Sequence, residues 1–201
     1  FLTLVRREVF RFLALYKQTL VPSVISSGLY IMVFGQSLGS RIGPIKDVSY
    51  ISYIIPGLAM MSVINNAYQN SSSSMIQSKF LRFIEDILVT PLSGLELSTS
   101  YILGGAVRGS LNGILVLFIG MMLTDLNIYS WPMTFLYIIT VSWTFAALGV
   151  IIGITAENWD QISVFTNFIF MPLTFLGGVF YSIDMLPEFW RGISQVNPLY
   201  W

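Results

Sequence analysis

Residues 126–156 read LNIYSWPMTFLYIITVSWTFAALGVIIGITA and contain no Asp, Glu, Lys or Arg. A helix needs about 20 apolar residues to cross roughly 30 Å of hydrocarbon, so this run is long enough to span a membrane. Three further charge-free runs have the same property, and they are Gln18–Ser40, Val48–Ser78 and Gln161–Ile183. The distribution of charges alone therefore predicts four membrane spans.

The composition of the whole chain supports this interpretation. Of its 201 residues, 55% are hydrophobic and 10% are charged, and the mean hydropathy is +0.74. A soluble domain has about 25% charged residues, so a soluble fold of this size would lack the charges to cover its surface. A fifth span contains Arg108 as its only charge. The predicted fold is an all-α integral membrane protein, a polytopic helical bundle with five spans over residues 19–39, 50–70, 99–123, 132–154 and 162–181.

Two segments outside the spans are expected to form amphipathic helices. In residues 1–17 the apolar side chains share one stripe and the basic ones lie elsewhere, which is typical of a helix in the membrane interface. Residues 75–90 predict a second helix, continuous with the span over 50–70. Residues 182–201 are apolar but too short to span, so they predict an extracytoplasmic re-entrant or interfacial segment.

The helix over residues 75–90 has one apolar face and one charged face. The apolar residues are Phe80, Phe83, Ile84, Ile87 and Leu88, and the charged residues are Lys79, Arg82, Glu85 and Asp86. A surface of this kind suits either the membrane interface or a partner protein. The sequence alone does not decide between these two interpretations.

The basic residues predict how the chain is oriented. With the N-terminus in the cytoplasm, Arg41, Lys46 and Arg191 lie outside the cell. The other seven basic residues then lie on the cytoplasmic side, and they are Arg6, Arg7, Arg11, Lys17, Lys79, Arg82 and Arg108. Because basic residues concentrate on the cytoplasmic side of membrane proteins, this orientation is favoured.

Several classes of function are excluded by residues that the chain lacks. It has no cysteine and no histidine, so thiolate nucleophiles, imidazole bases and Cys/His metal sites are excluded. It has no G-x-x-x-x-G-K-[ST] motif to hold ATP phosphates, and its zero net charge does not suit nucleic acid. The carboxylates of Glu157 and Asp160 are interpreted as part of a solvated turn. The sequence therefore predicts no catalytic, cofactor or metal site on this chain.

Two features of the predicted span over 99–123 concern packing and charge. Gly105, Gly109 and Gly113 recur at every fourth residue, which lets helices approach closely and predicts a packed bundle. A basic residue at a helix centre costs about 2.5 to 3.5 kcal/mol on the insertion scale. Arg108 is therefore expected either to reach the cytoplasmic edge or to pair with Glu96 or Glu85, with a structural or a gating role.

Polar residues inside the spans predict a substrate path. Buried amides at membrane depth need partners or water, so they should face the bundle interior or a second copy of the chain. The residues assigned to this path are Tyr30, Asn65, Asn66, Gln69, Asn167 and Thr174. Phe180 and Tyr181, with Trp190, form either an outer aromatic gate or an interfacial aromatic belt.

Taken together, these segments resemble the permease subunits of ABC-2 type transporters, which are bacterial ABC exporters. The resemblance covers essentially the whole chain. It rests on the basic N-terminal helix, on FLRFIEDILVTPLS at Phe80–Ser93, and on FLGGVFY at Phe175–Tyr181. Leu186-Pro187 and Asn197-Pro198-Leu199 follow in the same order as in the family.

The resemblance implies an assembly in the bacterial cytoplasmic membrane. The permease would form a homodimer or pseudo-dimer in the lipid, with the substrate path at its interface, and a sixth span would follow Trp201. Two ATP-binding subunits would carry ATP and Mg and would grip a cytoplasmic coupling helix. The residues implied for coupling are Phe80, Arg82, Phe83, Ile84, Glu85, Asp86, Ile87 and Leu88.

A membrane protein that does not use ATP is the competing interpretation. It would be a secondary transporter, a channel or a membrane assembly scaffold. Ion-coupled carriers usually place acidic residues inside their spans, whereas all ten acidic residues here fall in predicted loops or interfacial helices. This argues against ion coupling and leaves the scaffold and the identity of the substrate open.

Overall fold

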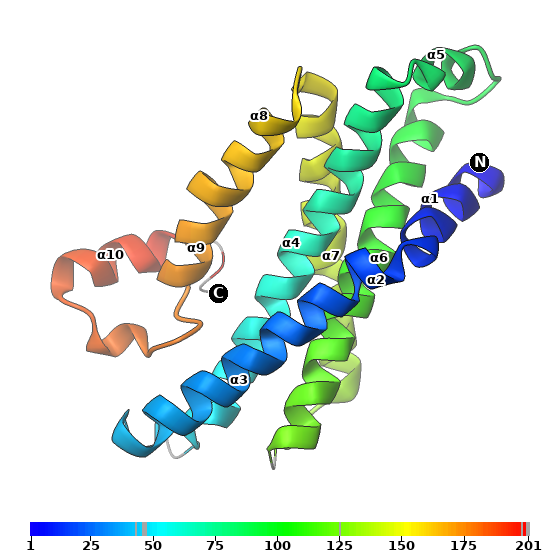
Figure 1. The fold of residues 1–201 in the computed structure, drawn as a ribbon. Helices are drawn as coiled ribbons and strands as arrows, with labels where there is room; N and C mark the ends of the chain where they lie inside the picture. Colours follow the sequence, from blue (N-terminus) through cyan, green and yellow to red (C-terminus); the bar gives the residue numbers. More distant parts are fainter. Residues whose placement is uncertain (43, 46–47, 125, 198, 200–201) are drawn as a thin grey trace.

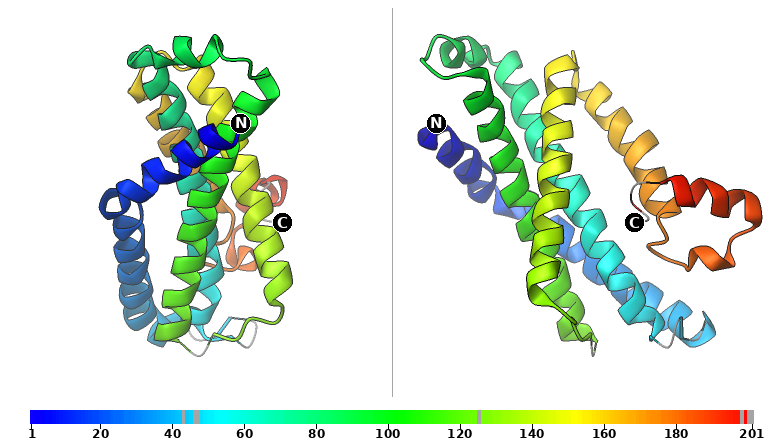
Figure 2. Two further views of the ribbon diagram at one scale, coloured as in Figure 1. Left: turned by 90° about the vertical axis from the view of Figure 1, so that its right-hand side faces the viewer. Right: turned by 180° about the vertical axis from the view of Figure 1, so that it is seen from behind.

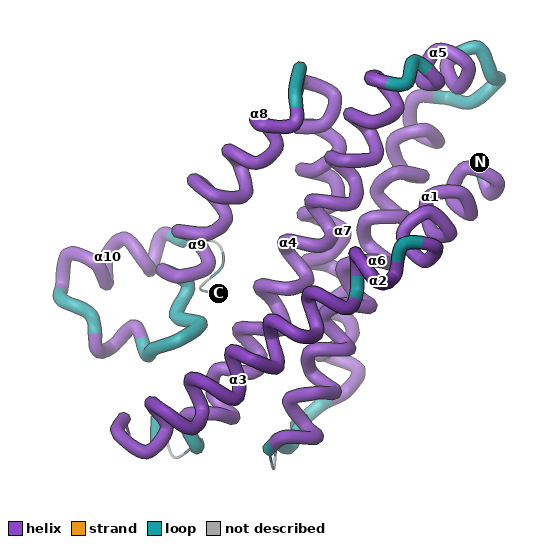
Figure 3. Tube along the Cα trace, in the orientation of Figure 1, coloured by secondary structure: helices purple, strands orange, loops and turns teal. Residues whose placement is uncertain are grey.

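A computed structural model describes residues 1–201 except 43, 46–47, 125, 198 and 200–201. Within the described residues every regular element is a helix, apart from one isolated bridge between Ile45 and Val48 (Figure 3). The longest helices are α4 (Tyr50–Phe80), α6 (Gly94–Leu123) and α7 (Trp131–Thr155). The three run side by side along the length of the molecule (Figures 1 and 2). The predicted all-helical class is confirmed.

The local sequence explains where the long helices begin. Ser93 caps α6, because its hydroxyl accepts a hydrogen bond from the amide of Glu96 at 3.2 Å. The Glu96 carboxylate accepts one in return from the amide of Ser93 at 2.8 Å, which completes a capping box. At α4 the side chain of Ser49 accepts from the amide of Ser52. These caps satisfy amides that a helix leaves unpaired at its start.

Glycines allow α6 and α7 to pack directly on α4. A methyl group at Gly109 of α6 would lie 2.7 Å from the Cβ of Ala67 and 2.9 Å from the carbonyl oxygen of Val63. A methyl group at Gly149 of α7 would lie 2.5 Å from the carbonyl oxygen of Tyr68. These distances are too short for any side chain, so the close approach predicted from the glycine spacing is confirmed.

The N-terminal part of the chain consists of α1 (Leu2–Ala14), α2 (Tyr16–Thr19) and α3 (Val21–Ile42). The predicted helix over residues 1–17 is present, with a break between α1 and α2. Leu4, Glu8 and Phe12 form the buried side of α1. Its location in the membrane interface stays a prediction.

The C-terminal part is irregular. It contains α8 (Trp159–Val164), the π-helix η1 (Phe165–Phe170), α9 (Met171–Leu176), the 3-10 helix η2 (Ile183–Met185) and α10 (Glu188–Val196). The predicted helix over 162–181 extends too far, because the chain leaves the helix at Gly177 and Gly178 takes a left-handed φ of 81°. In Figure 1, α10 lies level with the middle of α4.

Three helical segments of the described chain are long and apolar enough to cross a membrane, namely Tyr16–Gly35, Gly94–Leu123 and Trp131–Thr155. They correspond to the spans predicted over 19–39, 99–123 and 132–154. The second half of α4 is polar, and the segment over 162–181 is divided among α8, η1 and α9. The count of five spans therefore stays a prediction.

The predicted continuous helix over residues 75–90 is wrong. Helix α4 ends at Phe80, Arg82 takes a left-handed φ of 59°, and a separate short helix α5 (Phe83–Leu88) follows. The turn brings Ile84 back onto the apolar cluster of Met75 and Tyr101. A straight helix would leave this side chain unpacked, which gives a physical reason for the break.

Candidate functional site

Four of the residues predicted for a substrate path meet at one polar cavity. The cavity has a volume of about 260 Å³ and lies between α3 and α4, with Arg108 of α6 in its wall. Its lining includes Tyr30, Asn65, Asn66 and Gln69. We call it the Arg108 cavity. The structure thus brings these four residues, which the sequence analysis assigned to one path, together with Arg108 of a third helix.

Hydrogen bonds connect the walls of the Arg108 cavity. The hydroxyls of Ser23 and Ser62 lie 2.8 Å apart and join α3 to α4. The Asn66 amide donates to the carbonyl oxygen of Ser62 at 3.0 Å, and its side-chain oxygen accepts from Nη2 of Arg108 at 3.2 Å. Asn66 is buried, so the predicted inward orientation holds for this amide.

Arg108 does not pair with either acid predicted for it. Its side chain is only 8% exposed, and Asn66 is the hydrogen-bond partner of its guanidinium in the described structure. Glu96 lies twelve residues earlier on the same helix, about 18 Å away along its axis, and closes the capping box. Glu85 is exposed on α5. The expected ion pair is therefore wrong, because both acids are held at the end of the bundle.

A second polar cluster joins α1 to α4. The carboxylate of Glu8 is fully buried, accepts from the Ser74 hydroxyl at 2.5 Å and pairs with Arg7 at 2.9 Å and with Arg11 at 3.5 Å. Arg11 also donates to the side-chain and backbone oxygens of Asn70 at 3.0 and 3.1 Å. We call these five residues the ion-pair cluster.

The sequence analysis missed Glu8. It sits among basic residues in a helix predicted to lie on the membrane surface, where a solvated carboxylate is the ordinary expectation. Two signals were available in the sequence. Glu8 stands one residue from Arg7 and three from Arg11, and a run of serines at 71–74 offers hydroxyls without charges.

Helix α5 contacts the ion-pair cluster through one ring. The guanidinium of Arg7 lies 5.3 Å from the centre of the Phe83 ring, within the range of a cation–π contact. A groove of about 690 Å³ separates α1 from α5 and is lined by Arg7, Phe83, Asp86 and Ile87 among others. Arg7 therefore contacts both α5 and the buried carboxylate.

The predicted faces of this region need correction. Phe83, Ile84 and Ile87 are half-buried, whereas Phe80 and Leu88 are exposed, so the five apolar residues do not share a face. The break at Arg82 is the reason. Lys79 does not lie on a solvated face with Glu85 and Asp86, because its ammonium donates to the carbonyl oxygens of Ile154 at 2.8 Å and Ala156 at 2.7 Å and so caps α7.

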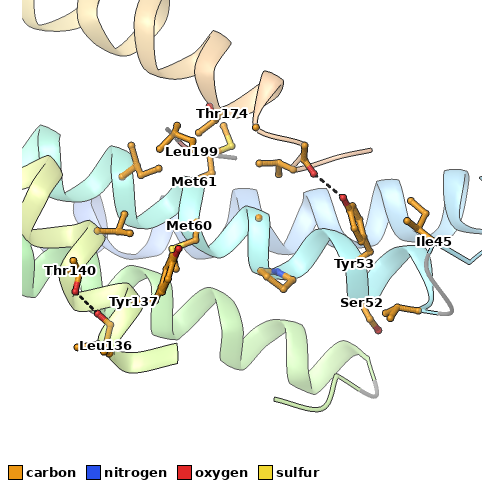
Figure 4. A pocket seen from close by; sticks show the side chains of 18 residues that line it. Ile45, Ser52, Tyr53, Met60, Met61, Leu136, Tyr137, Thr140, Thr174 and Leu199 are labelled. Atoms are coloured by element: carbon orange, nitrogen blue, oxygen red, sulfur yellow. Dashed lines mark hydrogen bonds between the residues drawn. The ribbon is translucent and has the colours of Figure 1, made fainter. Parts of the chain in front are cut away.

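The other residues predicted for the path lie elsewhere. Thr174 lines a larger, mainly apolar cavity of about 930 Å³ between α4, α7 and the segment after α9 (Figure 4). There the Tyr53 hydroxyl donates to the carbonyl oxygen of Gly178 at 3.3 Å and holds this segment on α4. Asn167 is exposed on η1.

The predicted aromatic gate is only partly assembled. The Phe180 ring lies 5.2 Å from Phe34, 5.3 Å from Phe175 and 6.1 Å from Tyr30, which joins α3 to the segment after α9. Trp190 instead packs against Phe189 on α10. The backbone oxygen of Tyr181 accepts from the Tyr53 hydroxyl at 3.2 Å.

Comparison with known proteins identifies the family of the chain. The family model described as ABC-2 type transporter matches residues 1–201. The chain is 43% identical over 193 residues to "Inner membrane transport permease YadH" of Escherichia coli (strain K12), which covers 96% of this chain and 75% of YadH. It is 24% identical over 176 residues to "Nodulation protein J" of Rhizobium leguminosarum bv. viciae, covering 85% of this chain and 66% of that protein. No solved structure matches the chain. This chain therefore belongs to the ABC-2 type transporter family.

Proposed function

We propose that this chain is the membrane-spanning permease subunit of an ATP-driven exporter in a bacterial inner membrane. Membership of the ABC-2 family supports transport, and a relative with 43% identity is named an inner membrane transport permease. In this proposal the chain carries out no bond chemistry. ATP and Mg bind to a separate ATP-binding subunit, and a second copy of the chain completes the substrate path, with the N-terminus in the cytoplasm.

The exposed apolar surface around α5 is the observation that carries this proposal. Leu88 is 65% exposed and Val89 is 84% exposed, and the charged side chains of Arg82, Glu85 and Asp86 are exposed beside them. Three charges on a six-residue helix and its cap suit a hydrocarbon environment poorly. Apolar anchors surrounded by charges are instead typical of a protein docking surface, so we assign this surface to the ATP-binding subunit.

The contacts behind α5 offer a route for movement into the bundle. Phe83 contacts Arg7, Arg7 pairs with Glu8, and Glu8 accepts a hydrogen bond from Ser74 of α4. Helix α4 then continues without a break from Ser74 to Asn66 in the wall of the Arg108 cavity. Displacement of α5 by an ATP-binding subunit would therefore move α1 and α4 together and change the width of this cavity.

Two substitutions test the docking surface. The chain is co-expressed with an ABC-type ATP-binding subunit from the same organism, and Leu88→Ser combined with Val89→Ser is compared with Tyr129→Ser. Tyr129 is an exposed aromatic residue in the loop between α6 and α7, at the opposite end of the bundle from α5 (Figure 1). We expect at least a tenfold loss of co-purified ATPase activity in the double variant and less than a twofold change in the control. Full activity in the double variant would exclude this surface as the docking site.

A further inference from the structure

The Arg108 cavity contains a buried positive charge that no acidic side chain neutralises. Arg108 is 8% exposed, and it forms no ion pair with any described residue. Its hydrogen bond to Asn66 joins it to a neutral amide. A buried charge is costly unless it is paired, so this guanidinium is suited to an anion from outside the chain.

The nearby carboxylate cannot take this role. Glu8 is already shared between Arg7 and Arg11, which line the groove beside α5 and not the Arg108 cavity. No Asp or Glu is among the residues that line the cavity.

The donors of Arg108 are only partly used. A guanidinium has five N–H donors in a planar fork that matches the oxygens of a phosphate or carboxylate. Nη2 donates to Asn66, whereas the buried Nε has no acceptor among the described residues.

The remaining lining suits the same ligand. The amide of Gln69 and the bonded pair of hydroxyls on Ser23 and Ser62 add neutral polar groups to the lining, whereas the Ser26 hydroxyl donates to the Pro22 carbonyl oxygen of its own helix. The volume of about 260 Å³ is below the roughly 300 to 1,000 Å³ that is usual for drug-sized ligands. A single anionic group fits this space.

We propose that the Arg108 cavity is a binding site for a phosphate group, supplied either by a phospholipid headgroup or by a soluble phosphate. Arg108 contributes the charge and the terminal donors, and the amide of Gln69 adds a neutral polar group beside it. This inference goes beyond transport, because it concerns the group that the cavity holds whether or not an ATP-binding subunit is attached.

Binding to the purified protein tests the proposal in two arms. The first arm titrates inorganic phosphate into protein in a neutral detergent by calorimetry. The second measures lipid retained by protein in nanodiscs of phosphatidylglycerol mixed with phosphatidylcholine. We expect Arg108→Gln to weaken binding at least tenfold in whichever arm shows it. Lys17→Gln removes an exposed positive charge from nearby α2, and it should change binding less than twofold.

A second variant keeps the test valid if Arg108→Gln fails to fold. Asn66→Asp preserves the size of the side chain and places a carboxylate where Asn66 Oδ1 now lies, 3.2 Å from Nη2 of Arg108. This internal anion should displace phosphate, so we expect folded protein with at least a tenfold weaker affinity. Binding in the phosphate arm identifies a soluble anion, and binding in the lipid arm alone identifies a headgroup. Absence of binding in both arms, full affinity in Asn66→Asp, or an equal loss in Lys17→Gln would overturn the proposal.

Discussion

The ion-pair cluster and the Arg108 cavity each bury one charged side chain against helix α4, Glu8 in the cluster and Arg108 in the cavity, but the two charges are balanced differently. In the cluster, Glu8 lies between Arg7 and Arg11 and also accepts from Ser74. In the cavity, Arg108 has only the neutral Asn66. A balanced charge ties two helices together, whereas an unbalanced one is available for a ligand. Removing charge from the two regions should therefore have opposite effects on stability.

The largest loss of stability is expected when the close contact between α4 and α6 is disrupted. Gly109→Leu would force α6 away from α4, because Ala67 Cβ and Val63 O leave no room for a side chain. We expect a loss of at least about 3 kcal/mol in the free energy of unfolding, measured by SDS titration in micelles. Gly28→Leu on α3 is the control, since a methyl group there meets no atom within 4 Å. Similar losses in both variants would show that the close packing of α6 on α4 at Gly109 is not the cause of the lost stability.

The ion-pair cluster should be the more sensitive of the two charged regions. Glu8→Gln leaves Arg7 and Arg11 without their carboxylate. Because both arginines are partly exposed, we expect a loss of about 2 to 3 kcal/mol, below the usual cost of breaking a fully buried pair. The same SDS titration measures it, with the exposed Glu157→Gln as control. A loss below about 0.5 kcal/mol would mean that the cluster does not hold α1 in place.

The Ser74 hydroxyl, which donates to Glu8, should contribute a smaller amount to the free energy of unfolding. Ser74→Ala removes a hydrogen bond to a buried carboxylate, which predicts a loss of about 1 to 2 kcal/mol. Ser73→Ala is the matched control, because its hydroxyl bonds only to the Asn70 carbonyl oxygen of its own helix. Equal thermal unfolding midpoints for the two variants would show that the hydrogen bond from Ser74 to Glu8 does not stabilise the protein.

The smallest effect, with the opposite sign, is expected in the cavity. Arg108→Met removes a buried charge that has no counter-charge, so stability in neutral detergent should stay the same or rise by up to about 1 kcal/mol. Thermal unfolding without phosphate or anionic lipid measures it. A loss of more than about 2 kcal/mol in the free energy of unfolding would show that Arg108 stabilises the fold as Glu8 does. It would contradict the proposed difference between the two regions.

The two regions also differ in how far the sequence predicts them. Tyr30, Asn65, Asn66 and Gln69 were expected to share a path because polar residues are conspicuous in apolar spans, and the structure places them at one cavity. Glu8 was missed because charge is ordinary in an interfacial helix. Its burial depends on Ser74, which lies 66 residues later in the chain.

Turns were harder to predict than helices. The spans predicted over 99–123 and 132–154 lie within α6 and α7, since a long apolar run has one stable form in hydrocarbon. The break at Arg82 was not predicted, because residues 75–88 have helical periodicity on both sides of it. The break brings Ile84 onto a cluster that includes Tyr101, which lies in the next long helix and is not visible from the local pattern.

By itself the sequence determined the helical class, the helices α6 and α7 and the close approach at the glycines, because each depends on composition or on spacing along one helix. The family was inferred from the order of motifs along the whole chain, and it is confirmed. Tertiary structure alone decided which charges are buried. Arg7 and Arg11 lie beside Glu8 on α1, but Ser74, which bonds to Glu8, and Asn66, which bonds to Arg108, come from α4 at positions that no periodicity relates to those charges. The energy of a buried charge depends on every group within a few ångströms, so its role becomes visible only when the helices are packed.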